Sequence, residues 1–177
     1  MKESGEKRLL AARIILLILL ISWMGVIFFL SGQKAEASDA ASGRVVHFLE
    51  NLFFPDWKAL PETEYLGHLY NLTYLTRKMA HFTEYMILGG LTAGFLLTLK
   101  IRRFYRLLWS FLAGTLYAVS DEIHQSFVAG RAPAAFDVCI DSAGVFIGTV
   151  LVLGIAAMCL LDHMRKKKVN GCTAASK

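Results

Sequence analysis

The sequence has little charge and very little cysteine. Charged residues make up 19% of the 177 residues, whereas an ordinary soluble domain carries about 25%. The three cysteines (Cys139, Cys159 and Cys172) are too few, and too apolar in context, for a disulfide framework, and they form no CxxC or Cys/His ligand spacing. No internal repeat, separate soluble domain, Ser-His-Asp pattern or Cys-His pattern is recognisable, so the sequence names no nucleophile.

The residues that are abundant are apolar, and they come in blocks. Hydrophobic residues account for 55% of the chain, and the net charge is +5. The basic residues cluster directly beside the apolar blocks, which is typical of membrane topology. We therefore expect the lipid bilayer, and no nucleic acid, as a partner.

Four apolar blocks are long enough to cross a bilayer, at about residues 9–30, 79–99, 107–127 and 138–161. A signal peptide is the alternative for the first block, but its apolar region exceeds the usual length of about 7–15 residues. We favour a retained span. Gly89, Gly90 and Gly94 in the second block, and the GxxxG spacing of Gly144 and Gly148, indicate close helix contacts.

Basic residues set the orientation. They lie in the N-terminal segment, in the loop between the second and third blocks, and in the tail after the fourth block. The positive-inside bias places these three segments in the cytoplasm. The predicted fold is all-α: a cell-membrane bundle of four transmembrane helices, with one domain over 1–177 and both termini cytoplasmic. Within the outer loop 31–76, apolar residues near 45–53 predict an amphipathic helix. It lies on the membrane surface or packs over the outer ends of the spans.

This topology collects the ionisable residues of three spans at one level, in the outer leaflet. Lys78, His81 and Tyr85 share one helical face, Asp121 and Gln125 share another, and Asp137 and Asp141 share a third. If the faces converge, they form a polar pocket that opens outward. Its candidate residues are Arg77, Lys78, His81, Glu84, Tyr85, Asp121, Glu122, His124, Gln125, Arg131, Asp137 and Asp141.

Five carboxylates and three permanent cations in this set leave two uncompensated negative charges, which are costly near a membrane. Protonation, imidazolium, water or a bound divalent cation would relieve them. No metal-ligand spacing among His81, His124 and the carboxylates is diagnostic, and no other cofactor is expected. Salt bridges and snorkelling explain single residues such as Arg77 or Asp137 equally well. For the whole set we favour a functional site.

Two long segments carry a family resemblance. RKMAHFTEYMILGGL (77–91) and SDEIHQSFVAGRAPAAFDVCIDSAGVFIG (120–148) closely resemble the signature blocks of the VanZ-like family, and Ser31-Gly32-Gln33 resembles its Ser-x-Gln step. Ala129 stands where the family commonly has proline before Gly-Arg. The resemblance implies a small integral membrane protein of the bacterial cell envelope. The family is named after a protein linked to low-level teicoplanin resistance, and fold and topology carry over more strongly than drug resistance.

The leading hypothesis is a pocket that binds or modifies a lipid-linked or glycopeptide-like molecule. Arg131, Arg77 and Lys78 would hold an anionic group. Asp121, Glu122, His81 and Glu84 are the candidates for proton transfer, and Tyr85, Gln125, Asp137, Asp141 and His124 complete the binding set. A non-enzymatic accessory protein is the alternative. A transporter ranks lowest, because the inner halves of the spans are apolar.

Overall fold

The computed structural model describes residues 2–131 and 134–175. Over these residues the protein is helical and contains no strand, which confirms the all-α prediction. The elements are α1 (Lys2–Ser31), α2 (Ala35–Phe53), the short 3-10 helix η1 (Pro55–Ala59), α3 (Glu62–Leu97), α4 (Arg103–Gln125) and α5 (Ala135–Ala175).

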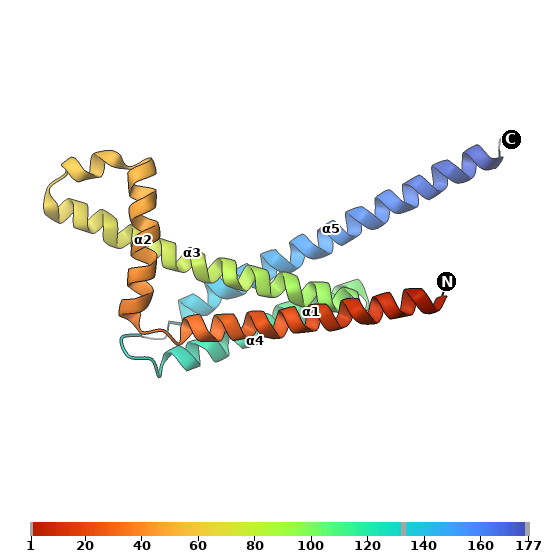
Figure 1. Cartoon of the computed structure of the whole chain (residues 1–177), viewed down its shortest axis with the longest axis horizontal. Helices are drawn as coiled ribbons and strands as arrows, with labels where there is room; N and C mark the ends of the chain where they lie inside the picture. The colour runs from red at the N-terminus through yellow and green to blue at the C-terminus, as the bar shows by residue number, and fades with distance from the viewer. Residues whose placement is uncertain (1, 132–133, 176–177) are drawn as a thin grey trace.

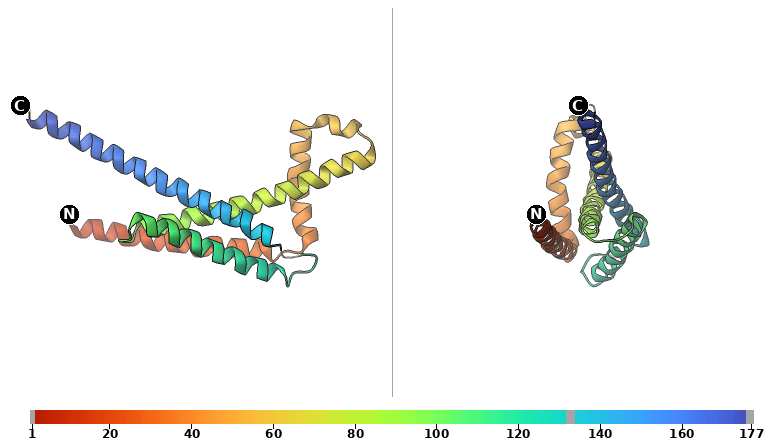
Figure 2. Two further views of the ribbon diagram at one scale, coloured as in Figure 1. Left: turned by 180° about the vertical axis from the view of Figure 1, so that it is seen from behind. Right: turned by 90° about the vertical axis from the view of Figure 1, so that its right-hand side faces the viewer.

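Helices α1, α3, α4 and the first half of α5 form the bundle, and the second half of α5 diverges from it (Figures 1 and 2). The N-terminus, the turn between α3 and α4, and the C-terminal part of α5 all lie toward one end of the molecule (Figure 1). The turns from α1 to α2 and from α4 to α5 lie toward the other. The candidate site lies at this second end.

Helices α3 and α5 cross so closely that their backbones touch. A Cβ atom on Gly148 would overlap the Met86 carbonyl oxygen, and one on Gly144 would overlap the Phe82 carbonyl oxygen. The Thr149 hydroxyl donates a hydrogen bond to the Gly89 carbonyl oxygen across the same contact, at 3.2 Å. The GxxxG spacing therefore marks the helix contact that the sequence predicted, because only glycine permits this approach.

The core is small, and the outside of the bundle is apolar. Ile27, Tyr85, Leu88, Ala118 and Val145 form the buried cluster. Large apolar side chains cover the outer surface instead of polar ones, with Ile21 61% and Phe29 70% exposed on α1 alone. Apolar surface this extensive is typical of an interaction or membrane surface.

Among the described residues, two helical stretches are long and apolar enough to cross a membrane, Glu3–Ser31 and Ala135–Lys167. The predicted spans at 79–99 and 107–127 each run two residues beyond the ends of α3 and α4, and these two helices do not meet the same criterion. Both helices carry charged side chains within or beside the apolar stretch, including Lys78, Glu84, Arg106, Asp121 and Glu122.

The segment predicted as an outer loop, 31–76, is mostly helical. Helix α2 spans much of it, and α3 begins at Glu62, directly after Pro61, instead of near residue 79. The added turns of α3 carry partly buried residues at helical spacing: Tyr65, His68, Leu69, Leu72, Thr73 and Thr76. This pattern lies inside a polar segment, where it is easily overlooked. Helix α5 likewise continues beyond the predicted end at 161.

Helix α2, η1 and the first turns of α3 form an arm beyond the bundle (Figure 1). Helix α2 packs against α3 through the buried Val46 and Glu50. The Glu50 carboxylate lies 3.1 Å from His47 Nδ1 and accepts a hydrogen bond from the Tyr65 hydroxyl at 3.0 Å. Burial raises the pKa of Glu50, but these hydrogen bonds and the charges of Lys58 and His47 outweigh it, so the pKa lies below its ordinary value.

Candidate functional site

The site is built around Asp121, in the last turn-and-a-half of α4. Its side chain is 3% exposed. Its Oδ2 accepts hydrogen bonds from the Ser31 hydroxyl at 2.8 Å and from Gln125 Nε2 at 2.9 Å. Asp121 and Gln125 face the same way because they are one helical turn apart. Asp121 thus ties the end of α1 to the end of α4.

Gln125 also binds Arg131, which lies in the turn between α4 and α5. Gln125 Oε1 accepts a hydrogen bond from Arg131 Nη1 at 3.1 Å, and Arg131 Nε donates to the Gln33 carbonyl oxygen at 3.3 Å. Gly130, with φ at 80°, provides the left-handed backbone that turns Arg131 back toward α4. The guanidinium is therefore held in place by two different segments of the chain.

A cavity of about 80 Å³ opens beside Arg131. It is lined by Arg77, Lys78, His81, Gln125, Gly130, Arg131 and Asp137. Three of these residues are permanent cations and one is a carboxylate, so the wall has an excess of positive charge. Burial and the nearby charge of Arg77 lower the pKa of the Arg131 guanidinium, which still stays charged at neutral pH.

The cations of the cavity wall are only partly neutralised by neighbouring acids. Lys78 pairs with Asp137, and Arg77 Nη1 pairs with Asp39 Oδ1 of α2 at 2.9 Å. Within the part of the chain that the structure describes, the hydrogen bonds of Arg131 go to neutral oxygens only. The arrangement favours an anion in the cavity, because an anion would receive the remaining guanidinium N–H donors.

The other predicted acids lie behind the cavity wall. Glu122 Oε2 accepts a hydrogen bond from the Ala134 amide at 3.0 Å, which anchors the start of α5. Asp141 is 1% exposed. Asp141 Oδ1, Asp121 Oδ1 and the Tyr85 hydroxyl are buried and have no hydrogen-bond partner among the described residues.

The two candidate histidines occupy different surroundings. His81 lines the cavity, and its Nδ1 lies 3.9 Å from Glu84 Oε2. Neither atom has a hydrogen-bond partner within the part of the chain that the structure describes. His124 instead stacks on Phe28 of α1 with ring centroids 4.1 Å apart. The structure therefore brings His81 to the cavity but not His124.

Three contributing residues were absent from the predicted set: Ser31, Gln33 and Asp39. Ser31 and Gln33 belong to the Ser-x-Gln step, which was the available signal for them. Gln33 contributes its backbone carbonyl oxygen, and since every residue has one, the residue type could not identify this contact. Asp39 lies in a helix that was expected to be loop, so its pairing with Arg77 had no sequence signal.

No group of three or more His, Cys, Asp or Glu side chains within residues 2–131 and 134–175 is arranged to hold a metal ion. The divalent cation considered from the sequence stays a prediction.

The family model of VanZ/LLP1 matches residues 16–158, which is most of the chain. The chain belongs to the VanZ/LLP1 family. The match encloses every candidate site residue, from Ser31 to Asp141. Comparison of this VanZ-like chain with curated proteins and with solved structures gave no match.

Proposed function

We propose that this VanZ-like protein is a multi-pass membrane protein of the bacterial cell envelope whose outer cavity binds the anionic group of a lipid-linked or glycopeptide-like molecule. Helices α1, α3, α4 and α5 would be the four spans, with both termini in the cytoplasm. The proposal rests on the cavity, and on the distribution of charge and apolar surface that gives the cavity its place in the membrane.

The arrangement of the helices supports this topology. Both ends of the chain and the α3–α4 turn lie toward one end of the bundle (Figure 1), as four antiparallel spans require. Lys7 and Arg8, Arg102 and Arg103, and the basic run after Asp162 are at this end. The positive-inside bias makes this end cytoplasmic, so the cavity faces outward.

The single observation that carries the binding proposal is the composition of the cavity wall. Arg77, Lys78 and Arg131 come from two separate segments and line one small space. A phosphate or carboxylate accepts charge-assisted hydrogen bonds from such groups. A volume of about 80 Å³ admits one small anionic group but no sugar ring or peptide. The remainder of the ligand would lie outside the cavity or in the bilayer.

Asp121 would serve this site by holding it in shape. It does not line the cavity, but it orients Gln125, which orients Arg131. The same holds for Glu122, whose carboxylate anchors the backbone where α5 begins. These contacts support a positioning role for the two acids, and they favour binding over acid–base chemistry as their contribution.

A second candidate function is proton transfer to or from the bound molecule, and one residue favours it. His81 is the only histidine of the described chain in the cavity wall, and Glu84 lies behind it. A histidine beside a bound phosphate or carboxylate, with an acid at its other side, is suited to general acid–base catalysis. Asp121 and Glu122 would then act indirectly.

Complementation of a strain lacking the gene, under envelope stress including teicoplanin exposure, tests the proposal. Arg131→Gln should abolish function at normal membrane levels, and Arg44→Gln should not, since Arg44 carries the same charge on the exposed face of α2. His81→Ala separates the two candidates: binding alone predicts partial function, and proton transfer predicts none. Full function of Arg131→Gln would contradict the proposal.

A further inference from the structure

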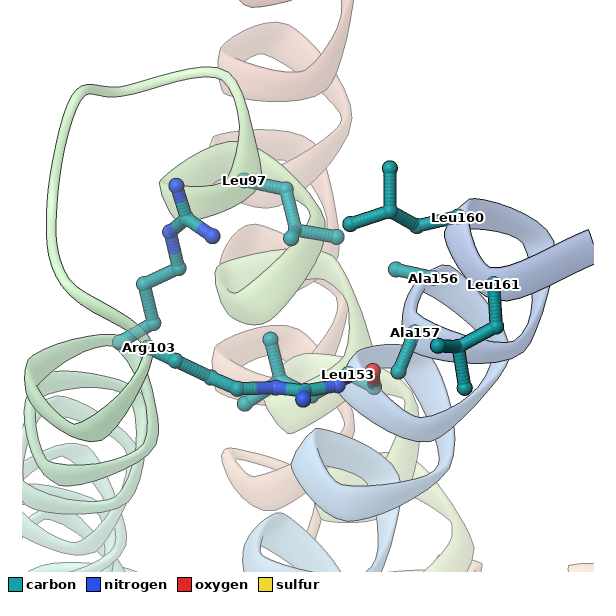
Figure 3. A pocket seen from close by; sticks show the side chains of 8 residues that line it. Leu97, Arg103, Leu153, Ala156, Ala157, Leu160 and Leu161 are labelled. Atoms are coloured by element: carbon teal, nitrogen blue, oxygen red, sulfur yellow. Dashed lines mark hydrogen bonds between the residues drawn. The ribbon is translucent and has the colours of Figure 1, made fainter. Parts of the chain in front are cut away.

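Two apolar grooves lie at the opposite end of the bundle from the cavity. The first, of about 320 Å³, lies between α3, α4 and α5 (Figure 3). It is lined by Leu97, Arg103, Arg106, Leu153, Ala156, Ala157, Leu160 and Leu161. The second, of about 440 Å³, is lined by Arg103, Phe104, Leu107, Val150, Leu153 and Gly154. Both grooves are bounded by Arg103 and Leu153, so they are neighbours.

Arg103 and Arg106, which line these grooves, each have N–H donors beyond those used in their recorded hydrogen bonds. Arg103 Nη2 donates to the Leu153 carbonyl oxygen at 3.2 Å, and Arg106 Nη2 donates to the Leu99 carbonyl oxygen at 3.1 Å. Arg106 Nε is buried and has no hydrogen-bond partner among the described residues. Each guanidinium carries five N–H groups. Arg103 is also the first residue of α4, where the helix dipole favours an anion.

We propose that these grooves bind one anionic diacyl phospholipid. Its phosphate would accept hydrogen bonds from Arg103 and Arg106, and its two acyl chains would lie in the two grooves. A pair of apolar grooves separated by cationic groups matches one phosphate carrying two chains. With the topology proposed above, the lipid belongs to the inner leaflet, where it would hold α4 against α5 as α5 leaves the bundle.

Charge complementarity selects the class of lipid. A zwitterionic head group carries its own cation, which would meet the like charges of Arg103 and Arg106 in the groove wall. Soluble phosphates would find the arginines but leave the grooves empty. An anionic phospholipid is the ligand that uses the charge and the apolar surface together.

Native mass spectrometry of the detergent-purified protein tests the proposal. We expect one molecule of phosphatidylglycerol to be retained, about tenfold or more in preference to phosphatidylcholine with the same chains. Glycerol 1-phosphate should not compete. Equal retention of the two lipids would overturn the proposal, as would equal competition by glycerol 1-phosphate.

Variants locate the lipid. Replacing Arg103 and Arg106 together by glutamine should lower phosphatidylglycerol retention about tenfold or more. Replacing Lys100 and Arg102 by glutamine removes the same charge at the same end but outside both grooves, and should leave retention nearly unchanged. An equal loss in the two double variants would show general charge attraction and refute the site.

A third variant tests the site without removing either arginine, so that lost lipid retention can be distinguished from lost folding. Ala157→Trp fills the first groove and keeps both arginines, so it should also lower retention while circular dichroism shows unchanged helix content. Retention equal to that of the wild type would contradict the placement of an acyl chain there. Arg131→Gln should retain the lipid fully, so a failure of the outer cavity and a failure of this site are distinguishable.

Discussion

The crossing of α3 and α5 gives the sharpest prediction about stability. Gly148→Ala places a methyl group where the Met86 carbonyl oxygen lies, and 3.1 Å from the Gly90 nitrogen. These are backbone atoms, which cannot rotate away, so the two helices must move apart. Gly154→Ala on the same helix is the matched control, because nothing lies within 4 Å of a Cβ atom there.

The magnitude follows from three contributions. Overpacking costs about 1–3 kcal/mol, and contact with rigid backbone indicates the upper end. Loss of the Thr149–Gly89 hydrogen bond adds roughly 0.6 kcal/mol in a membrane setting. Replacing glycine by alanine within a helix returns about 0.5–1 kcal/mol. Gly148→Ala should therefore lower the free energy of unfolding by about 2–3 kcal/mol, and Gly154→Ala should leave it unchanged or raise it slightly.

Thermal unfolding in detergent, followed by circular dichroism, measures the difference. For a protein of this size 1 kcal/mol corresponds to about 2–4 °C, so the Tm of Gly148→Ala should lie roughly 4–12 °C below that of Gly154→Ala. Equal Tm values for the two variants would refute the close crossing of α3 and α5.

Three further predictions concern topology, the second histidine and the arm. In a cysteine-free background, a membrane-impermeant maleimide should label Gly43→Cys but not Gly5→Cys in intact cells; the reverse pattern would invert the topology, and both positions have space for a side chain. His124→Phe should complement like the wild type because the ring can still stack on Phe28, and a loss equal to that of His81→Ala would place His124 in the site. Because the folded-state pKa of Glu50 is lowered, its stabilising effect is present above the ordinary value of 4.5 and is lost as the pH falls through the folded value. The protection of α2 amides against hydrogen exchange, relative to an unstructured peptide at the same pH, should therefore fall over this acid range in the wild type. An equal fall in Glu50→Gln would contradict this role.

Much of the arrangement could be predicted because helical spacing is a local property. The positions of Asp121 and Gln125, one turn apart, predict a shared face, and their side chains are hydrogen bonded. Gly144 and Gly148 likewise predict a close helix contact from spacing alone. The bias of the basic residues predicts which segments lie toward the same end of the bundle, and these segments do lie toward one end of the molecule (Figure 1).

The parts that the sequence did not predict depend on long-range geometry. His124 follows Asp121 by three residues, so local spacing leaves open whether its side chain faces the cavity or α1. In the structure it faces α1, where its ring stacks on Phe28. The role of Gln33 depends on a backbone carbonyl, and the pairing of Arg77 with Asp39 depends on where α2 crosses α3. The early start of α3 was hidden because its partly buried face is flanked by polar residues.

Binding of a short prenyl phosphate tests the central claim, an anion site formed by Arg131 and its neighbours, most directly. Farnesyl phosphate and uncharged farnesol would be titrated into the detergent-solubilised wild type, Arg131→Gln and Arg44→Gln, with the Arg103 and Arg106 double variant included to separate the inner grooves. We expect Arg131→Gln to weaken farnesyl phosphate binding about 10–100-fold, the loss of a charge-assisted contact of about 1.5–3 kcal/mol, while the other variants bind normally and farnesol binds weakly throughout. Equal affinity for the phosphate and the alcohol, or an affinity unchanged in Arg131→Gln, would contradict the account.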